Sequence, residues 1–89
     1  MITATLTIIN RLGLHARAAT KLAATCARYP CTISCGRDGN HVDAKSIMSL
    51  ILLAAPKGST LDFIFDGEEA EQAHSAVAAL IADFFGEGG

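Results

Sequence analysis

Apolar and hydroxyl side chains alternate along residues 2–8 of the chain. One set of alternate positions holds Ile2, Ala4, Leu6 and Ile8, and the three positions between them are threonines. A period of two places the apolar side chains on one face of a strand and the threonines on the other. The sequence therefore predicts a strand here whose apolar face must be covered by the rest of the chain.

Three more strands are predicted further along. Cys31, Ile33 and Cys35 alternate with Thr32 and Ser34. The turn residues of positions 37–40 then predict a hairpin to a short strand over 41–43. A fourth strand is predicted over 60–65, where Leu61, Phe63 and Phe65 alternate with their neighbours. All four predicted strands have one apolar face.

Helical spacing appears in three segments. The first helix is predicted over Ala16–Arg28, because Pro30 prevents its extension. A short second helix begins after Ser46, whose hydroxyl can cap the first turn, and closes at Pro56. The third helix is expected to begin among Glu68, Glu69 and Glu71 and to end at Gly86. Its buried stripe is predicted to hold Ala73, Ala76, Val77, Leu80, Ile81 and Phe84.

The element order β-α-β-β-α-β-α predicts an α+β fold. Two parallel strands joined by a helical crossover, with a third strand between them, form a split βαβ unit. We expect an open-faced β-sandwich, in which three helices cover one face of a four-stranded antiparallel sheet. The 89 residues, 51% of them apolar, predict a single domain over 1–89.

Composition argues against two classes of partner. The net charge is −2 and lysine and arginine do not cluster, so neither nucleic acid nor an anionic membrane surface is an expected partner. The longest apolar stretch, 47–56, is too short to span a bilayer, and residues 1–9 lack the basic start of a secretory signal. We expect a cytoplasmic protein without membrane insertion.

The three cysteines, Cys26, Cys31 and Cys35, are an odd number without CxxC spacing. This spacing favours small buried side chains over a disulfide framework or a zinc site. Neither a metal nor a cofactor is therefore expected. A metal-binding module built from these cysteines and His41 is a remote alternative. His41 and His74 are themselves expected to be solvated surface residues.

A candidate nucleophile lies where a loop meets the first predicted helix. His15 precedes Ala16, Arg17 and Ala18, whose backbone amides have no acceptor within the helix. Free amides, the helix dipole and the Arg17 guanidinium would together stabilise a phosphate held on the imidazole. A neutral imidazole is nucleophilic near pH 7. On spacing alone, a polar helix cap at His15 and a solvated Arg17 remain an equal alternative.

Two motifs resemble those of a known family. Residues 10–18, NRLGLHARA, resemble the active-site signature of HPr, the histidine-containing phosphocarrier of the phosphoenolpyruvate-dependent phosphotransferase system. Residues 45–48, KSIM, resemble its regulatory-serine motif. The resemblance implies that His15 accepts phosphate at Nδ1 from phosphorylated enzyme I and passes it to an enzyme IIA, with Arg17 stabilising the group. It implies a phosphotransfer intermediate, not an independent enzyme, in sugar uptake or in a regulatory, nitrogen-type branch. A monomer is expected, because the site of a carrier must be accessible to successive partners.

The resemblance also implies a regulatory site and a docking surface. Ser46 resembles the serine phosphorylated by HPr kinase/phosphorylase, a modification that would place negative charge beside the docking surface. By analogy with the family, docking is expected to use Leu14, Thr20, Ile47, Met48 and Ile51 around His15 and Arg17.

Two positions depart from the common pattern. Ala18 stands where proline is commonest, which resembles the nitrogen-related branch called NPr, and Ser49 stands where glycine is frequent. The alternative is therefore a chiefly regulatory phosphoprotein that binds target proteins according to the phosphorylation of His15 and Ser46.

Overall fold

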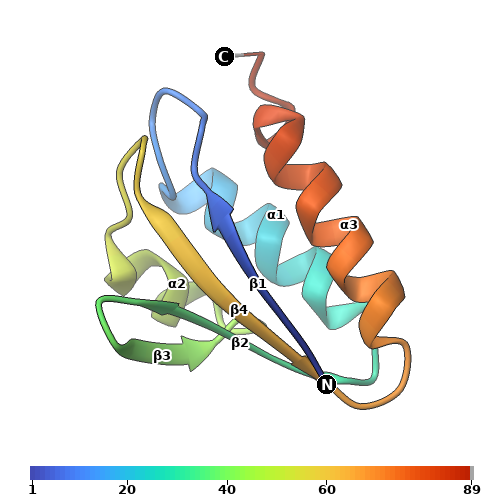
Figure 1. Cartoon of the computed structure of the whole chain (residues 1–89). Coiled ribbons are helices and arrows are strands. Elements are labelled where there is room, and N and C mark those ends of the chain that lie inside the picture. Colours follow the sequence, from blue (N-terminus) through green and yellow to red (C-terminus); the bar gives the residue numbers. More distant parts are fainter. Residues whose placement is uncertain (89) are drawn as a thin grey trace.

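A computed structural model describes residues 1–88 of the chain. Its elements follow the predicted order (Figure 1). They are β1 (Ile2–Thr7), α1 (Ala16–Ala27), β2 (Thr32–Arg37), β3 (Asn40–Asp43), α2 (Ile47–Leu53), β4 (Thr60–Asp66), α3 (Ala70–Ala82) and a 3₁₀ turn, η1 (Phe84–Gly86).

The four strands form one antiparallel sheet in the order β1-β4-β2-β3. β4 lies between β1 and β2, with Leu61 opposite Leu6 and Phe63 opposite Cys35. Because β1 and β2 both run antiparallel to β4, they are parallel to each other, and α1 connects them across the inserted strand. The predicted split βαβ unit is confirmed.

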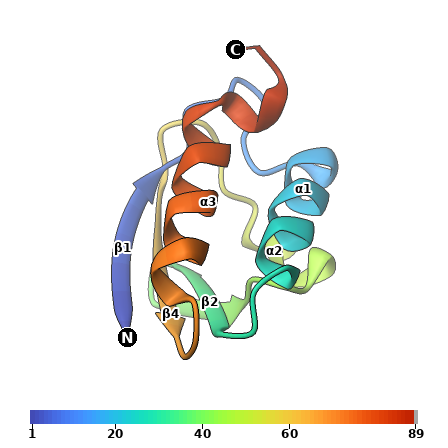
Figure 2. The ribbon, with the colours of Figure 1, turned by 90° about the vertical axis from the view of Figure 1, so that its right-hand side faces the viewer.

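The helices cover one face of the sheet and leave the other face open (Figure 2). The alternation in β4 explains this, because Leu61, Phe63 and Phe65 are buried while Asp62 is exposed. On the open face, the Thr5 hydroxyl donates a hydrogen bond of 2.8 Å to the Asp62 carboxylate. The α+β, open-faced architecture predicted from the element order is therefore confirmed.

The end of the chain departs from the prediction. α3 ends at Ala82, and the expected helix through Phe84 is replaced by a turn in which Phe84 and Phe85 have φ of 56° and 52°. This left-handed pair breaks the helical path, and the Phe85 ring is buried in the core while Phe84 is only half-buried. At the other end of α3, Glu71 is the acidic residue of the first turn, because Glu69 is the N-cap with a left-handed φ of 63°.

The structure tests the burial predicted for the three cysteines and for two of the histidines. Cys26, Cys31 and Cys35 are free and buried, as expected, and burial raises the pKa of the Cys26 and Cys35 thiols to about 12. His41 is exposed in β3, as expected. The expectation for His74 is wrong, because its ring is half-buried with its centroid 5.5 Å from that of Phe65.

Candidate active site

His15 is the N-cap residue of α1. Its backbone is extended, with φ of −79° and ψ of 179°, and its carbonyl accepts the first helical hydrogen bond, from the Ala19 amide at 2.8 Å. Arg17 is exposed and His15 occupies the cap position, as the alternative expected, but the His15 ring itself makes no capping hydrogen bond. The side chain is 28% exposed. The imidazole is therefore solvent-reachable, and the amides of residues 16–18 precede the first helical hydrogen bond.

Gly13 fixes the entry into α1. Its φ is 68°, and the Leu14 amide beside it donates a 2.8 Å hydrogen bond to the Ala55 carbonyl. A Cβ on Gly13 would lie 2.6 Å from that same carbonyl oxygen and 2.9 Å from the Cα of Pro56. Only glycine allows the loop before His15 to approach the segment after α2 this closely.

We expect Gly13→Ala to lower the free energy of unfolding by about 3 kcal/mol, because the new methyl group combines backbone strain with a clash against backbone atoms. Chemical denaturation measures this loss. Gly39→Ala is the matched control, since Gly39 has a φ of 81° but nothing within 4 Å of an added Cβ. It should lose only about 1 kcal/mol. Equal losses in the two variants would show that the contact with Ala55 does not constrain the loop.

Three cations share the hollow in which His15 lies. The lining includes Arg11, Arg17 and Lys21 together with the ring of His15, and it is completed by Gly86 and Glu87 from the end of the chain. Sequence reasoning singled out Arg17 alone. Lys21 could have been found, because it lies four residues after Arg17 and hence on the same helical face. The hollow is suited to an anion carrying more than one negative charge.

A buried asparagine brings the end of the chain to the histidine. The Asn10 side chain is wholly buried and donates hydrogen bonds from Nδ2 to the Gly13 carbonyl at 2.8 Å and to Oε1 of Glu87 at 2.9 Å. The other carboxylate oxygen, Oε2, contacts Nε2 of His15. Figure 2 shows the end of the chain beside the loop that leads into α1. Glu87 is thus a site residue that sequence reasoning missed.

The pKa of Glu87 is lowered, first by the hydrogen bond from Asn10 and then by the hydrogen bond and charge of His15 and the charge of Lys21. Burial opposes this shift, since the side chain is only 11% exposed. Glu87 therefore carries its negative charge at neutral pH. No local motif announces this contact, because Glu87 lies 72 residues after His15.

The predicted docking residues divide into two groups. Ile47 and Met48 are 41% and 65% exposed, Thr20 is exposed, and Ile51 is half-buried against the core. Leu14 is 3% exposed, so its assignment to the docking surface is wrong. The hydrogen bond from its amide to Ala55 turns the side chain into the core. The loop instead exposes Leu12, at 61%, which was not anticipated.

Ser46 is the N-cap of α2, as predicted. Its hydroxyl accepts a 3.3 Å hydrogen bond from the Ser49 amide. We expect Ser46→Ala to lower the free energy of unfolding by about 1 kcal/mol, because a first-turn amide loses its acceptor. Ser75→Ala is the control, since Ser75 lies exposed inside α3 and its replacement should change stability by under about 0.5 kcal/mol. Denaturation curves that coincide for the two variants would show that the Ser46 hydroxyl does not stabilise α2.

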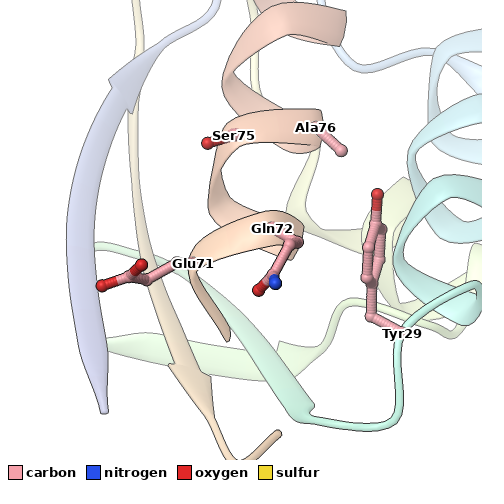
Figure 3. Close-up of a pocket in the computed structure, with 5 residues that line it drawn as sticks. All are labelled: Tyr29, Glu71, Gln72, Ser75 and Ala76. Carbon is pink, nitrogen blue, oxygen red and sulfur yellow. The ribbon is translucent and has the colours of Figure 1, made fainter. Parts of the chain in front are cut away.

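A second hollow lies between the first half of α3 and Tyr29 (Figure 3). The Tyr29 ring faces Gln72 and Ala76, while Glu71 points away from it. This hollow has no cluster of charged groups comparable to the one around His15. Among residues 1–88, no group of three or more His, Cys, Asp or Glu side chains could hold a metal ion.

Comparison with known proteins shows which family the chain belongs to. A family model described as "PTS HPr component phosphorylation site" matches residues 2–83. The chain belongs to the HPr family. This HPr-family chain is 49% identical over 82 residues to the phosphocarrier protein HPr of Cupriavidus necator, with 92% of each chain covered. It is 37% identical over 81 residues to the phosphocarrier protein NPr of Shewanella violacea, covering 91% and 89%.

The solved structures agree with this assignment. The crystal structure of HPr-C-His from Thermoanaerobacter tengcongensis superposes with a TM-score of 0.94 at 34% identity, covering 98% of both chains. As a member of the HPr family, the chain is a phosphocarrier of the phosphotransferase system. Within the part of the chain that the structure describes, no helix is both long and apolar enough to cross a membrane.

Proposed function

We propose that His15 is the residue that carries the phosphoryl group and that Arg17 and the amides of residues 16–18 stabilise it. The observation that carries this assignment is the His15 ring itself, which is partly exposed at the start of α1 and is not used as a cap. The cations around it supply the second condition, since the product carries about two negative charges.

The transfer needs no external base. The lone pair of one ring nitrogen attacks phosphorus, the new P–N bond forms, and the donor atom keeps the electron pair of the bond that breaks. The ring that results is positively charged, and the phosphoryl oxygens receive hydrogen bonds from the helix amides and the Arg17 guanidinium. Onward transfer is the same step reversed against a different acceptor.

The donor in this proposal is phosphorylated enzyme I, and the acceptor is an enzyme IIA protein or domain. Exposed Ile47 and Met48, with Thr20 and the rim of Ile51, form the docking surface. The packing of α2 against α1 supports this role, because it holds this surface on the element next to His15. Met48 suits a surface that meets partners in succession, since its flexible side chain can repack. The protein would act as a cytoplasmic monomer.

Regulation through Ser46 is a second candidate function. The cap hydroxyl immediately precedes the exposed pair Ile47 and Met48, so a phosphate added there by a kinase of the HPr kinase/phosphorylase type would bring negative charge to the docking surface. The start of a helix tolerates that charge while a negatively charged partner would be repelled. A chiefly regulatory, NPr-like role would depend on this modification and on that of His15.

One labelling experiment tests the assignment of the phosphoryl group to His15. The protein is incubated with phosphoenolpyruvate and enzyme I, and intact mass spectrometry is expected to show a gain of about 80 Da, one phosphoryl group. Peptide mapping at alkaline pH should place this group on His15, and brief acid treatment should remove it, because a phosphoramidate hydrolyses in acid while a phosphoserine does not. An acid-stable group on Ser46 with an unmodified His15 would overturn the assignment.

A further inference from the structure

The strained turn at the end of the chain places Glu87 beside His15. Two consecutive residues other than glycine, Phe84 and Phe85, adopt left-handed backbone conformations. Each such residue costs of order 1 kcal/mol or more, and a fold keeps such strain where its surroundings impose it. Here the buried Phe85 ring and a 2.6 Å hydrogen bond from Nζ of Lys21 to the Phe85 carbonyl hold the turn.

The turn delivers a carboxylate whose two oxygens have different partners. Oε1 of Glu87 accepts from Nδ2 of Asn10, and Oε2 contacts Nε2 of His15. Asn10 cannot turn its amide around, because its other partner, the Gly13 carbonyl, also only accepts. Asn10 therefore presents N–H to Oε1 and leaves Oε2 to the histidine.

This arrangement decides which nitrogen of a neutral imidazole carries the proton. A carboxylate only accepts hydrogen bonds, so Nε2 must donate and hold the proton, and Nδ1 keeps its lone pair. The ring has no capping bond that would compete for Nδ1. We propose that Glu87, held by Asn10, is a positioning residue that fixes the His15 ring in the tautomer whose Nδ1 is the phosphoryl acceptor. This inference rests on the proposed function of His15.

The same contact acts throughout the transfer. As the P–N bond forms at Nδ1, the ring becomes positively charged, and the proton on Nε2 stays in place beside the Glu87 carboxylate. The carboxylate stabilises the charge that develops, and no proton has to leave for the reaction to proceed. Glu87 touches the ring and not the phosphoryl group, which is held by other residues.

Two substitutions separate this role from a general effect of negative charge. In Glu87→Gln, Asn10 still requires an oxygen at the Oε1 position, so the new amide nitrogen faces Nε2 and donates to it. Nε2 must then accept, and the proton moves to Nδ1, which loses its nucleophilic lone pair. In Glu87→Ala, water replaces the carboxylate and both tautomers are present. A charge effect alone would affect the two variants equally, whereas a tautomer effect makes the glutamine variant the slower one.

The experiment measures the initial rate of phosphoryl uptake from phosphoenolpyruvate and enzyme I in the full chain. We expect Glu87→Ala to be about tenfold slower than wild type and Glu87→Gln about 100-fold slower. Two-bond ¹H–¹⁵N spectra of the His15 ring, which identify the protonated nitrogen, should show it moving from Nε2 to Nδ1 in the glutamine variant. Glu71→Gln is the matched control, because Glu71 is exposed at the opposite end of α3, and it should behave as wild type.

Every outcome of this comparison bears on the inference. A glutamine variant as fast as the alanine variant, or an unchanged His15 spectrum in both, overturns it. Thermal unfolding of each variant identifies a loss caused by instability, and the ring spectrum reports the tautomer regardless of rate. If wild type takes up phosphate on a residue other than His15, the proposed function fails. Uptake on His15 that ignores Glu87 removes only this inference.

Discussion

Replacing His15 by alanine is expected to abolish the gain of about 80 Da from phosphoenolpyruvate and enzyme I. In the proposed function the imidazole in the hollow is the nucleophile, and alanine would leave the three cations and the free amides of α1 without a group to phosphorylate. Intact mass spectrometry over a time course measures the loss. The fold should survive, since the ring is partly exposed and does not cap the helix, and the free energy of unfolding should change by no more than about 1 kcal/mol.

The other two histidines supply the controls for this prediction. His41 is exposed on β3, and His74 packs on Phe65 from α3, so neither lines the hollow at the start of α1. His41→Ala and His74→Ala should therefore take up phosphate at the rate of wild type. Uptake that persists in His15→Ala and disappears in either of these variants would move the acceptor to another part of the molecule.

The fold was predictable from the sequence because its signals are local. The alternation in β1 and β4, the glycine-containing turn before β3 and the cap at Ser46 are each contained within a few residues, and the structure confirms all of them. The split βαβ unit was predictable from the helical crossover between two parallel strands, and the structure places β4 between them. Several boundaries moved by one or two residues, as at Arg28, which caps α1 instead of continuing it, and the end of the third helix moved further, to Ala82.

Only part of the candidate site was predictable, because only part of it is formed by residues that are close in sequence. His15 and Arg17 lie two residues apart at a helix start, and a local pattern is enough to single them out. Asn10 and Glu87 meet through a tertiary contact between residues 77 apart in sequence. The apolar stripe of α3 gave no reason to expect its end at Ala82, because Phe84 and Phe85 continue a pattern typical of a helix. The docking prediction for Leu14 was wrong for a similar reason, since the loop that buries Leu14 is held by a hydrogen bond to Ala55, which is distant in sequence.

The second large effect is expected from Phe85→Ala, which should lower the free energy of unfolding by about 4 kcal/mol. The Phe85 ring is completely buried, so its removal leaves a cavity beside the core. Chemical denaturation measures the loss. Phe84→Ala is a matched control, because Phe84 is also left-handed but only half-buried, and it should lose about 1 kcal/mol.

The Phe85→Ala variant also tests whether the packing of the core affects the site around His15. Burying a phenylalanine side chain contributes about 2 to 3 kcal/mol, enough to offset the left-handed strain of about 1 to 2 kcal/mol at a residue such as Phe85. Without the ring this offset is lost, the turn relaxes, and Glu87 leaves His15. We therefore expect Phe85→Ala, at a temperature where it is still folded, to take up phosphate as slowly as Glu87→Ala, while Phe84→Ala keeps the wild-type rate. Wild-type uptake by a folded Phe85→Ala protein would show that the turn does not hold the carboxylate in place.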